Sequence, residues 1–510
     1  MAHLGRGVRL LVCAAVLQWL PAGAAHAEGT AGAGKWSRPA TLSDCPGAGR
    51  PQVVFPSDKP TRGTGPGAIV WSASPPCPGG AGVRVAAIGP EDVPGPPTEP
   101  RTAAGAAIVL RGPVAATAGP YGRIVIAAAS AAPPTIPAAG LLLTEGPAGG
   151  PFAAPIAAGL AASPFALTTA YLGDVALVSM GGARRGGLAH RRGNARRGEL
   201  ARPRGKAGRA GSVQRVLAAQ RRGEAEPTGG LRLRVQRHHA NRFAAPVQVS
   251  AGWGAPIEAL AVALDFRSDA LVVWARRGSV YARELPATGA PHRVERLGAV
   301  GRGPASGARI AAVLSDDDRA IVAWSDRRGG RTSVYVSRSQ AGVRFGSPRL
   351  LESFSDPSDL PSYKDSPQIV RLSSESVMMA WTGAENGHWV VRTAAIDLNA
   401  VSVPSTISPP GSDALLAALA PGPDDEALAL WTEPQPTPTG PNLGWQAIFA
   451  ARGIDASPAR TIFAAGEQVA PPGPNSDATV AVDPDSDRAV VAWRTGVGAV
   501  DYSLHAIGGA

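Results

Sequence analysis

Two copies of nearly the same heptad lie 169 positions apart in this chain: "DRAIVAW" runs from Asp318 to Trp324, and "DRAVVAW" runs from Asp487 to Trp493. The same pattern of a polar start, an apolar run and a final tryptophan also ends at Trp71, Trp274, Trp381 and Trp431. Two weaker copies, residues 122–127 and 174–179, lack the tryptophan. From Trp274 onward the tryptophans are 50, 57, 50 and 62 residues apart. A period near fifty built from short apolar runs predicts a radial or solenoid repeat fold.

Each unit has room for four short strands. In the unit that begins at residue 309, the predicted parts are a strand at 309–315, a polar turn at 316–319, and strands at 320–324, 333–339 and 343–352. The third of these strands alternates apolar and polar residues, as a half-exposed strand does. Four antiparallel strands per repeat form one blade of a β-propeller. Eight copies of the second strand predict an all-β, eight-bladed β-propeller, and seven blades with one degenerate unit is the alternative.

Composition supports an all-β chain. The sequence contains 63 Gly and 49 Pro, and its short runs of Val, Ile and Ala are bounded by Gly, Pro, Asp and Ser. No long segment carries the apolar stripe of a helix. We therefore expect residues 28–510 to form a single β-propeller domain.

Residues 1–27 are predicted to be a secretory signal peptide. Arg6 and Arg9 precede the apolar run "LLVCAAVLQWL", and "AHA" supplies small residues for cleavage after Ala27. A membrane anchor is the weaker interpretation, because the run is too short to span a bilayer. No later stretch is apolar enough to span a membrane, so we expect a protein exported to the cell exterior, without a transmembrane segment.

The two ends of the chain are predicted to close the ring. The last unit stops after its third strand, at residues 500–507, while the mature N-terminus supplies a spare stretch, "KWSRPATL", at residues 35–42. This stretch matches the fourth-strand pattern of "VRFGSPRLL", residues 343–351. An N-terminal strand that completes the last blade would remove the sheet edges that a broken ring exposes.

The cysteine pair is predicted to strengthen this closure. Only Cys45 and Cys77 remain after signal removal, and such a pair in an exported protein predicts one disulfide, with two free thiols as the alternative. Cys45 follows the closing strand, in a connection between blades, and Cys77 lies in the second-to-third connection of the first blade. Alternate connections of an antiparallel sheet share a face, so the two cysteines should meet there.

The tryptophan that ends each second strand is predicted to pack between neighbouring blades, since a large apolar area holds such sheets together. A row of ligand-stacking tryptophans is the alternative.

An Asp-containing polar turn followed by "AIVAW" resembles the repeats of sialidase-like and related secreted β-propellers, over most of the chain. The resemblance implies the fold. The Ser-x-Asp-x-Gly-x-x-Trp box and the N-terminal Phe/Tyr-Arg-Ile-Pro motif of sialidases are absent from this sequence, and no arginine triad can be assigned. The activity is not implied, because function depends on the site that a fold carries.

The sequence predicts no metal site, no cofactor and no catalytic residue. "DPDSD" places Asp483, Asp485 and Asp487 at alternate positions, and "SDDD" places Asp316–Asp318 together, which resembles the start of a calcium loop. The later Glu and the central Gly of an EF-hand are absent, and Asp is favoured in turns, so ordinary turns are the preferred interpretation. The His residues do not show zinc spacing, and no Gly-x-Ser-x-Gly elbow is present.

One segment carries all the excess positive charge. Residues 183–226 contain 13 Lys or Arg and three Glu, a net charge of +10, whereas the whole mature chain has a net charge of +9. The segment is rich in Arg and Gly and nearly free of aromatic residues, so it is predicted to be a disordered insertion between the second and third strands of the third blade. The predicted polyanion-binding residues are Arg184, Arg185, Arg191, Arg192, Arg196, Arg197, Arg202, Arg204, Lys206 and Arg209.

The preferred function is non-enzymatic binding of an anionic partner outside the cell. A mobile arginine arm would neutralise charge and release counterions, with strong salt dependence. The expected partners are an anionic polysaccharide, a wall polymer or an acidic surface. Specific reading of nucleic acid is not expected, because stacking aromatic residues are absent. An idle loop is the alternative for the arm.

The loops at 353–366 and 433–442 should share a face with the arm, and long loops commonly carry function. Asp356, Asp359 and Asp365 in the first loop are expected to pair with the arm when no ligand is present.

An enzyme is the less favoured class. The alternatives are a sialidase-like glycoside hydrolase acting in the central depression and a structural or assembly scaffold.

Overall fold

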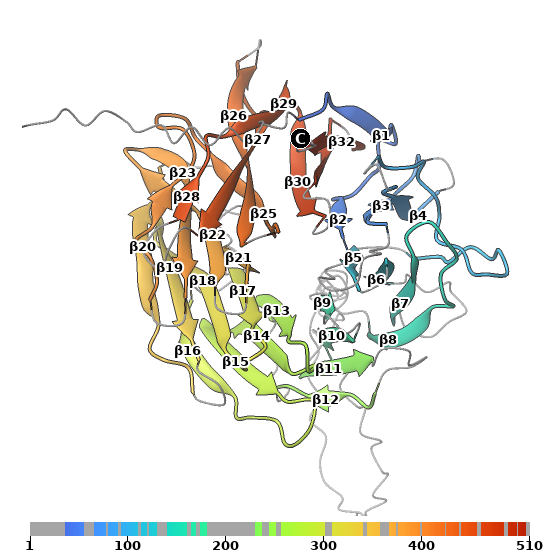
Figure 1. The fold of residues 1–510 in the computed structure, drawn as a ribbon, viewed down its shortest axis with the longest axis horizontal. Coiled ribbons are helices and arrows are strands. Elements are labelled where there is room, and N and C mark those ends of the chain that lie inside the picture. Colours follow the sequence, from blue (N-terminus) through green and yellow to red (C-terminus); the bar gives the residue numbers. More distant parts are fainter. Residues whose placement is uncertain are drawn as a thin grey trace, which may run out of the picture.

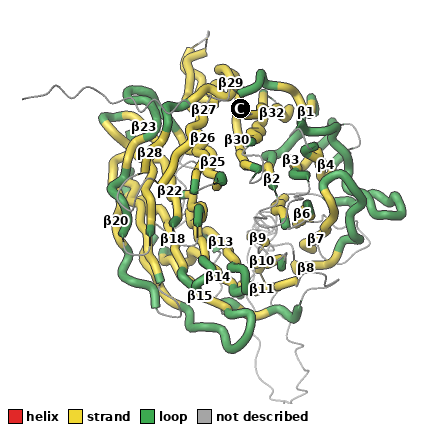
Figure 2. Tube along the Cα trace, in the orientation of Figure 1, coloured by secondary structure: helices red, strands yellow, loops and turns green. Residues whose placement is uncertain are grey.

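In the described part of the computed structural model, the chain forms β-strands and the loops that join them (Figure 2). Among the described residues, no helix is long and apolar enough to cross a membrane. The structure describes residues 36–55, 66–77, 80–89, 93–110, 114–119, 122–129, 140–160, 165–169, 174–180, 230–236, 244–250, 257–300, 309–339, 344–357, 367–373, 376–397, 400–423, 425–437, 440–455, 461–483, 488–496 and 498–505.

The strands form eight antiparallel sheets in a ring, so the predicted eight-bladed β-propeller is confirmed and the seven-bladed alternative is wrong (Figure 1). This is the fold that the resemblance to sialidase-like propellers implies. From the innermost strand outwards, blades 1 to 4 consist of β2 (Gln52–Val54), β3 (Ala68–Ala73) and β4 (Gly82–Ala87); β5 (Val114–Ala118), β6 (Arg123–Ala129), β7 (Gly140–Pro147) and β8 (Ile156–Leu160); β9 (Ala166–Thr169), β10 (Val175–Met180), β11 (Leu231–Gln236) and β12 (Val247–Gln248); and β13 (Ala259–Leu264), β14 (Ala270–Arg276), β15 (Ser279–Leu285) and β16 (Glu295–Ala299).

Blades 5 to 8 follow the same plan. In the same order they consist of β17 (Arg309–Leu314), β18 (Ala320–Arg328), β19 (Arg331–Arg338) and β20 (Arg349–Ser355); β21 (Gln368–Arg371), β22 (Val377–Glu385), β23 (His388–Ile396) and β24 (Ser405–Thr406); β25 (Leu415–Pro421), β26 (Glu426–Thr437), β27 (Gly440–Asp455) and β28 (Thr461–Phe463), with β29 (Glu467–Gly473) also on β27; and β30 (Asn475–Val482), β31 (Ala489–Thr495), β32 (Ala499–His505) and β1 (Ala40–Ser43). Blade 1 has three strands, and its outer position is filled by Thr98, which exchanges two backbone hydrogen bonds with Val85.

The N-terminal strand completes the last blade, as predicted. β1 pairs with β32 in antiparallel register, with Ala40 opposite Tyr502. The pairing begins before β1, because Trp36 bridges His505 and the backbone N–H of Ser37 donates to the carbonyl of Leu504 at 2.7 Å. The ring therefore closes by backbone hydrogen bonds between the two ends of the chain.

The predicted packing of tryptophans between blades is also confirmed. The six tryptophans that end second strands are at most 2 % exposed, and each lies in a cluster with apolar residues of the preceding blade. Trp324 of blade 5, for example, packs with Leu271 and Val273 of blade 4. Gly298 in β16 leaves room for this ring, because a Cβ added there would lie 2.6 Å from Cζ2 of Trp324.

Two glutamines join the innermost strands of neighbouring blades. The amide of Gln52 in β2 donates to the carbonyl of Val114 at 2.6 Å and accepts from the N–H of Ala116 at 2.8 Å, both in β5. Gln368 in β21 makes the same pair of bonds to the backbone of β25. Each side chain thus satisfies backbone groups that face the gap between two separate sheets.

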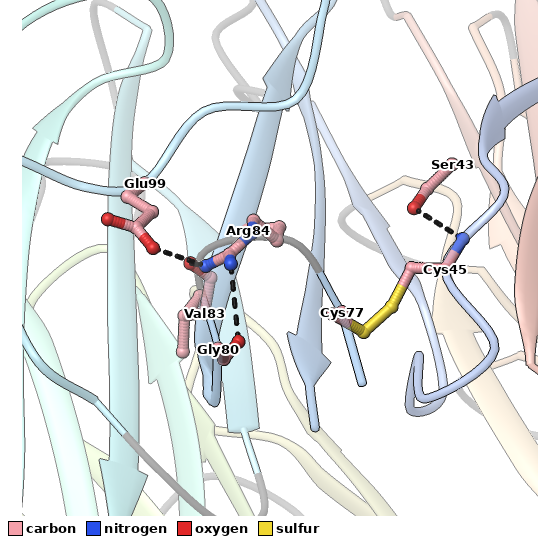
Figure 3. The surroundings of a disulfide bond; sticks show 7 residues. All are labelled: Ser43, Cys45, Cys77, Gly80, Val83, Arg84 and Glu99. Atoms are coloured by element: carbon pink, nitrogen blue, oxygen red, sulfur yellow. Dashed lines mark hydrogen bonds and ion pairs between the residues drawn. A yellow bond between two sulfur atoms is a disulfide. The ribbon is translucent and has the colours of Figure 1, made fainter. Parts of the chain in front are cut away.

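The predicted disulfide joins Cys45 and Cys77 (Figure 3). Cys45 follows β1 and Cys77 follows β3, so the bond connects the closing blade to blade 1. Both residues are buried, and Ala73 packs beside them. The covalent bond and the β1–β32 pairing therefore hold the same seam.

We expect reduction of this disulfide to lower the free energy of unfolding of the mature protein by about 2–4 kcal/mol, since the bond restricts the unfolded chain. Urea unfolding with and without dithiothreitol measures the difference. The double variant Cys45→Ser, Cys77→Ser is the control and should not respond to dithiothreitol. Equal unfolding midpoints of the oxidised and reduced wild-type protein would contradict the prediction.

Candidate functional site

The ring has two faces that differ in the connections they carry. Second-to-third-strand connections and blade-to-blade connections share one face, and the bond between Cys45 and Cys77 joins one of each kind. We call this the disulfide face. First-to-second and third-to-fourth connections share the opposite face, which we call the aspartate face because it carries the Asp-containing turns of the repeat.

The arginine segment connects two strands at the disulfide face. Residues 181–230 join β10 to β11, and the last residue of β10, Met180, pairs directly with the first residue of β11, Leu231. The ten predicted polyanion-binding residues all lie outside the described residues. The two described ends of this connection therefore lie side by side at the end of the β10–β11 ladder.

The equivalent connections of the next two blades also carry arginine. β14 ends at Arg276 and is followed by Arg277, and the hairpin between β18 and β19 contains Arg327, Arg328 and Arg331. These residues follow the tryptophan of the repeat in "WARRG" and "WSDRRGGR", a signal that our sequence interpretation missed. Arginine thus occupies the same connection in three consecutive blades.

The arginines of blade 5 differ in their pairing. Arg327 donates from Nε to Asp356 at 2.6 Å, so Asp356 has a partner inside its own blade. The predicted pairing of Asp356 with the arm involves residues outside the described ones and stays a prediction. Asp359 and Asp365 lie outside the described residues. Arg328 forms an ion pair of 3.0 Å with Asp326 through Nε, but its side chain is 57 % exposed. Arg331 is exposed and donates to Ser353. Arg328 and Arg331 are therefore accessible to a ligand.

A pocket of about 430 Å³ lies beside the disulfide, at the seam between blades 8 and 1. Its lining includes Asp44 and Arg84 together with both cysteines. Arg84 forms an ion pair of 3.0 Å with Glu99, which neutralises its charge (Figure 3). Because Arg84, the arginine that lines the pocket, is paired with Glu99, we regard the pocket as part of the closure seam and not as a site for an anionic ligand.

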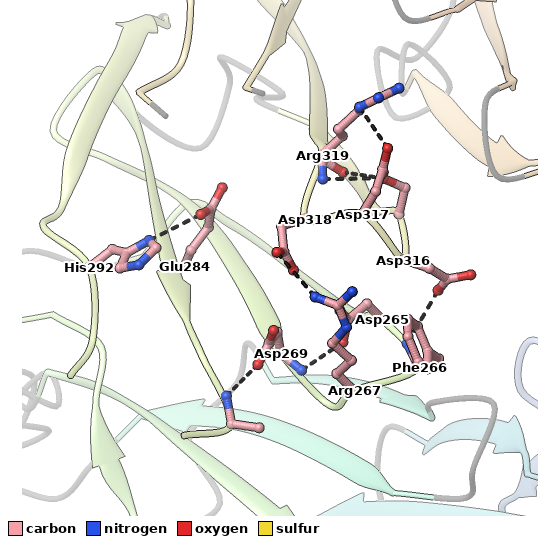
Figure 4. Close-up of polar contacts among 12 residues, drawn as sticks. Asp265, Phe266, Arg267, Asp269, Glu284, His292, Asp316, Asp317, Asp318 and Arg319 are labelled. Atoms are coloured by element: carbon pink, nitrogen blue, oxygen red, sulfur yellow. Dashed lines mark hydrogen bonds and ion pairs between the residues drawn. The ribbon is translucent and has the colours of Figure 1, made fainter. Parts of the chain in front are cut away.

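The aspartate face carries a cluster of three carboxylates from two blades (Figure 4). Asp265 and Asp269 flank the turn between β13 and β14, and Asp318 lies in the turn between β17 and β18. One oxygen of each carboxylate lies within 4.8 Å of the other two. Neighbouring blades bring these turns together although Asp269 and Asp318 are far apart in the sequence.

Each member of the cluster has one oxygen held by the protein. Asp265 Oδ1 accepts the backbone N–H of Asp269 at 2.7 Å, and Asp269 Oδ1 accepts the N–H of Ala287. Asp318 Oδ2 accepts from Arg267 at 3.3 Å. The other oxygens of Asp265 and Asp318 are buried and have no hydrogen-bond partner among the described residues.

Burial makes Asp265 the unusual member. The residue is 1 % exposed, and burial raises the pKa of its carboxyl from 3.8 to about 6, with the charges of Asp269 and Asp318 adding to the rise. At neutral pH the group is therefore ionised at a cost in stability. Nearby, a hydrogen bond from Arg371 lowers the pKa of Asp316.

Polar contacts extend from the cluster to the blades on either side. Ser268 donates to Asp174 of blade 3 at 2.5 Å, and Arg371 of blade 6 donates from Nη1 to Asp316 of blade 5 at 2.8 Å. The backbone N–H of Phe266 in blade 4 donates to the same Asp316. A row of contacts therefore runs over four consecutive blades, from blade 3 to blade 6.

Burial argues against a glycosidase pair in this cluster. Both carboxylates of such a pair must reach the scissile bond of the sugar. Asp265 is too deeply buried for a sugar to reach, and one oxygen of each of the three carboxylates lies within 4.8 Å of the others. Hard oxygen donors this close together have instead the spacing of ligands around one cation.

Asp318 was predicted to lie in an ordinary acidic turn, and its proximity to Asp265 and Asp269 was not predicted. The signal was present, because "DFRSDALVVW" and "SDDDRAIVAW" place Asp before the second strand in two consecutive units. Consecutive units of a propeller are neighbours in the ring, so equivalent turns approach each other.

No protein-family model matches the chain, and no curated protein matches it. Similar solved structures include an ulvan lyase, which is 10 % identical with a TM-score of 0.40, over 76 % of this chain and 90 % of that chain. A Dyadobacter fermentans protein of unknown function is 10 % identical with a TM-score of 0.34, over 92 % of this chain and 97 % of that chain. An α-L-arabinofuranosidase from Fusarium graminearum is 9 % identical with a TM-score of 0.29, over 49 % of this chain and 93 % of that chain. At these identities and TM-scores, the similarity carries no argument about activity.

We expect Asp265→Asn to stabilise the protein at neutral pH in metal-free buffer. The pKa of Asp265 is higher in the folded state, so between about pH 4 and pH 6 the folded state binds more protons than the unfolded chain. The wild-type free energy of unfolding therefore falls as pH rises through this window. The amide keeps the acceptor for Asp269 and removes the buried charge, which should add on the order of 1–3 kcal/mol above pH 6.

Urea unfolding of both proteins between pH 4 and pH 8 measures this difference. The advantage of the variant should be small near pH 4, grow up to about pH 6 and then stay constant. A difference between the two proteins that does not change with pH would contradict the assignment.

Proposed function

We propose that this protein is exported and binds an anionic polymer outside the cell through its disulfide face, without catalysis. In this proposal, residues 1–27 are the signal peptide, residues 28–510 form the propeller domain, and the arginine segment 183–226 is the main contact. The propeller supplies a rigid support for that segment.

The observation that carries the proposal is the alignment of arginine at one connection in consecutive blades. The segment of net charge +10 joins β10 to β11, and the next two blades present Arg277, Arg328 and Arg331 at the equivalent position. Charges that share one face act together on a long anionic ligand, whereas the same charges spread over the whole surface would not. The buried Cys45–Cys77 bond is consistent with a protein that functions outside the cell.

Retention on heparin and polygalacturonate resins across a sodium chloride gradient tests the proposal. We expect deletion of residues 183–226 to weaken binding at least about tenfold and to flatten its salt dependence, because fewer counterions are released. Met180 and Leu231 are paired, so a short Asn-Gly turn can replace the segment without disturbing blade 3. A second variant with Gln at the ten predicted positions keeps the loop length and should lose binding equally.

The contribution of the blades is tested separately. The double variant Arg328→Gln, Arg331→Gln, which keeps the arginine segment, should be retained less strongly than the wild-type protein. Arg293→Gln is the matched control, since Arg293 is an exposed arginine in the third-to-fourth connection of blade 4, on the aspartate face. Equal retention of wild type, the deletion variant and the Gln variant would refute the proposal and favour a scaffold with an idle arm.

A further inference from the structure

We propose that Asp265, Asp269 and Asp318 bind one calcium ion that links blades 4 and 5 at the aspartate face. The inference is independent of polymer binding at the disulfide face.

The distances suit a single ion. Oxygen ligands lie 2.3–2.6 Å from calcium, so any two ligands of one ion are at most about 5 Å apart. The cluster meets this limit, with one oxygen of each carboxylate within 4.8 Å of the others (Figure 4). Two of the ligands come from one turn and the third comes from the turn of the next blade, so the ion would sit between the blades.

The unpaired oxygen of Asp265 points to a missing cation. Its residue is 1 % exposed, and Oδ2 makes no hydrogen bond with any residue that the structure describes. A buried carboxylate oxygen without a partner is costly, and buried charges in proteins are normally paired or bound to metal. Asp318 Oδ1 in the same cluster is buried and without a partner as well.

Arginine does not supply the missing positive charge. Within the cluster, the ion pair of Arg267 is with Oδ2 of Asp318, at 3.3 Å, and the Arg267 side chain is 51 % exposed. Arg371 is engaged with Asp316. Arg267 is therefore the one guanidinium among the described residues with an ion pair to the cluster, and Arg371 acts on Asp265 only through space, so the charge of Asp265 has no direct partner.

The donor set selects the kind of ion. All three side-chain ligands are carboxylates, which are hard donors, and no His or Cys belongs to the cluster, so zinc is disfavoured. Calcium accepts irregular sets of six to eight oxygens, whereas magnesium requires a near-ideal octahedron. Water and backbone carbonyls would complete the calcium sphere. Extracellular calcium sites have dissociation constants of about 10⁻⁴ to 10⁻³ M, and we expect this range.

The test is thermal unfolding of the full mature chain in EDTA and in 10 mM calcium chloride, together with calcium titration by calorimetry. Calcium should raise the wild-type Tm by about 2 °C or more, because a ligand that binds only the folded state stabilises it. Asp265→Asn and Asp318→Asn should each weaken calcium binding at least tenfold and lose the calcium-dependent shift of Tm. Loss of the shift in a folded variant supports the site.

Asp425→Asn is the matched control. Asp425 lies in the equivalent turn of blade 7 and has the same left-handed backbone as Asp318, with φ of 64° and 61°, but it is exposed and outside the cluster. This variant should keep the full calcium response. The proposal is overturned if calcium neither binds nor shifts the wild-type Tm, or if the shift persists in both cluster variants. In the first case the fold tolerates the buried carboxylate of Asp265 without a cation, and in the second the ion binds elsewhere.

Discussion

The burial of a second-strand tryptophan against the preceding blade, which occurs in six of the eight blades, is the interaction on which the ring depends. The eight sheets are separate hydrogen-bonded units, so apolar contact must supply most of the adhesion between them. In blade 5, Trp324 fills the space between its own sheet and blade 4, and Gly298 is small enough to admit the ring. Such contacts do not select a particular partner, which is why every blade can follow the same plan. They also leave the two chain ends to be joined by other means.

The seam between blades 8 and 1 combines three kinds of interaction. Trp71 packs against Val490 and Ala492 of blade 8, β1 forms a ladder with β32, and the Cys45–Cys77 bond crosses the same junction. Apolar contact alone would allow this blade pair to separate without breaking the chain. The ladder and the covalent bond remove that possibility, so the ring behaves as a closed unit.

Periodicity made most of this architecture predictable. The repeated second strand indicated eight blades, and the match between residues 35–42 and the fourth-strand pattern indicated the closure, because both depend on local sequence. The cluster of Asp265, Asp269 and Asp318 was not predicted, since it depends on the distance between turns of neighbouring blades and on how deeply one side chain is buried. The three-stranded sheet of blade 1 and the extra β29 in blade 7 were missed for a related reason. Both depend on how irregular loops pair with an outer strand, which the repeat does not encode.

The direction of the second strand explains why the two faces differ. In blades 4 and 5 this strand begins next to an aspartate and ends at arginine, and second strands run the same way in every blade. A repeat with this polarity brings equivalent aspartates of neighbouring blades together on one face and equivalent arginines together on the other. Like charges gathered by the ring must then be compensated, by Arg371 on Asp316, by Asp356 on Arg327, or by a bound partner. The carboxylates lie in short turns held against the next blade, so their remaining charge suits a small cation. The arginines of blades 4 and 5 lie at hairpins on the opposite face, where residues 183–226 add a net charge of +10, so their remaining charge suits a polymer.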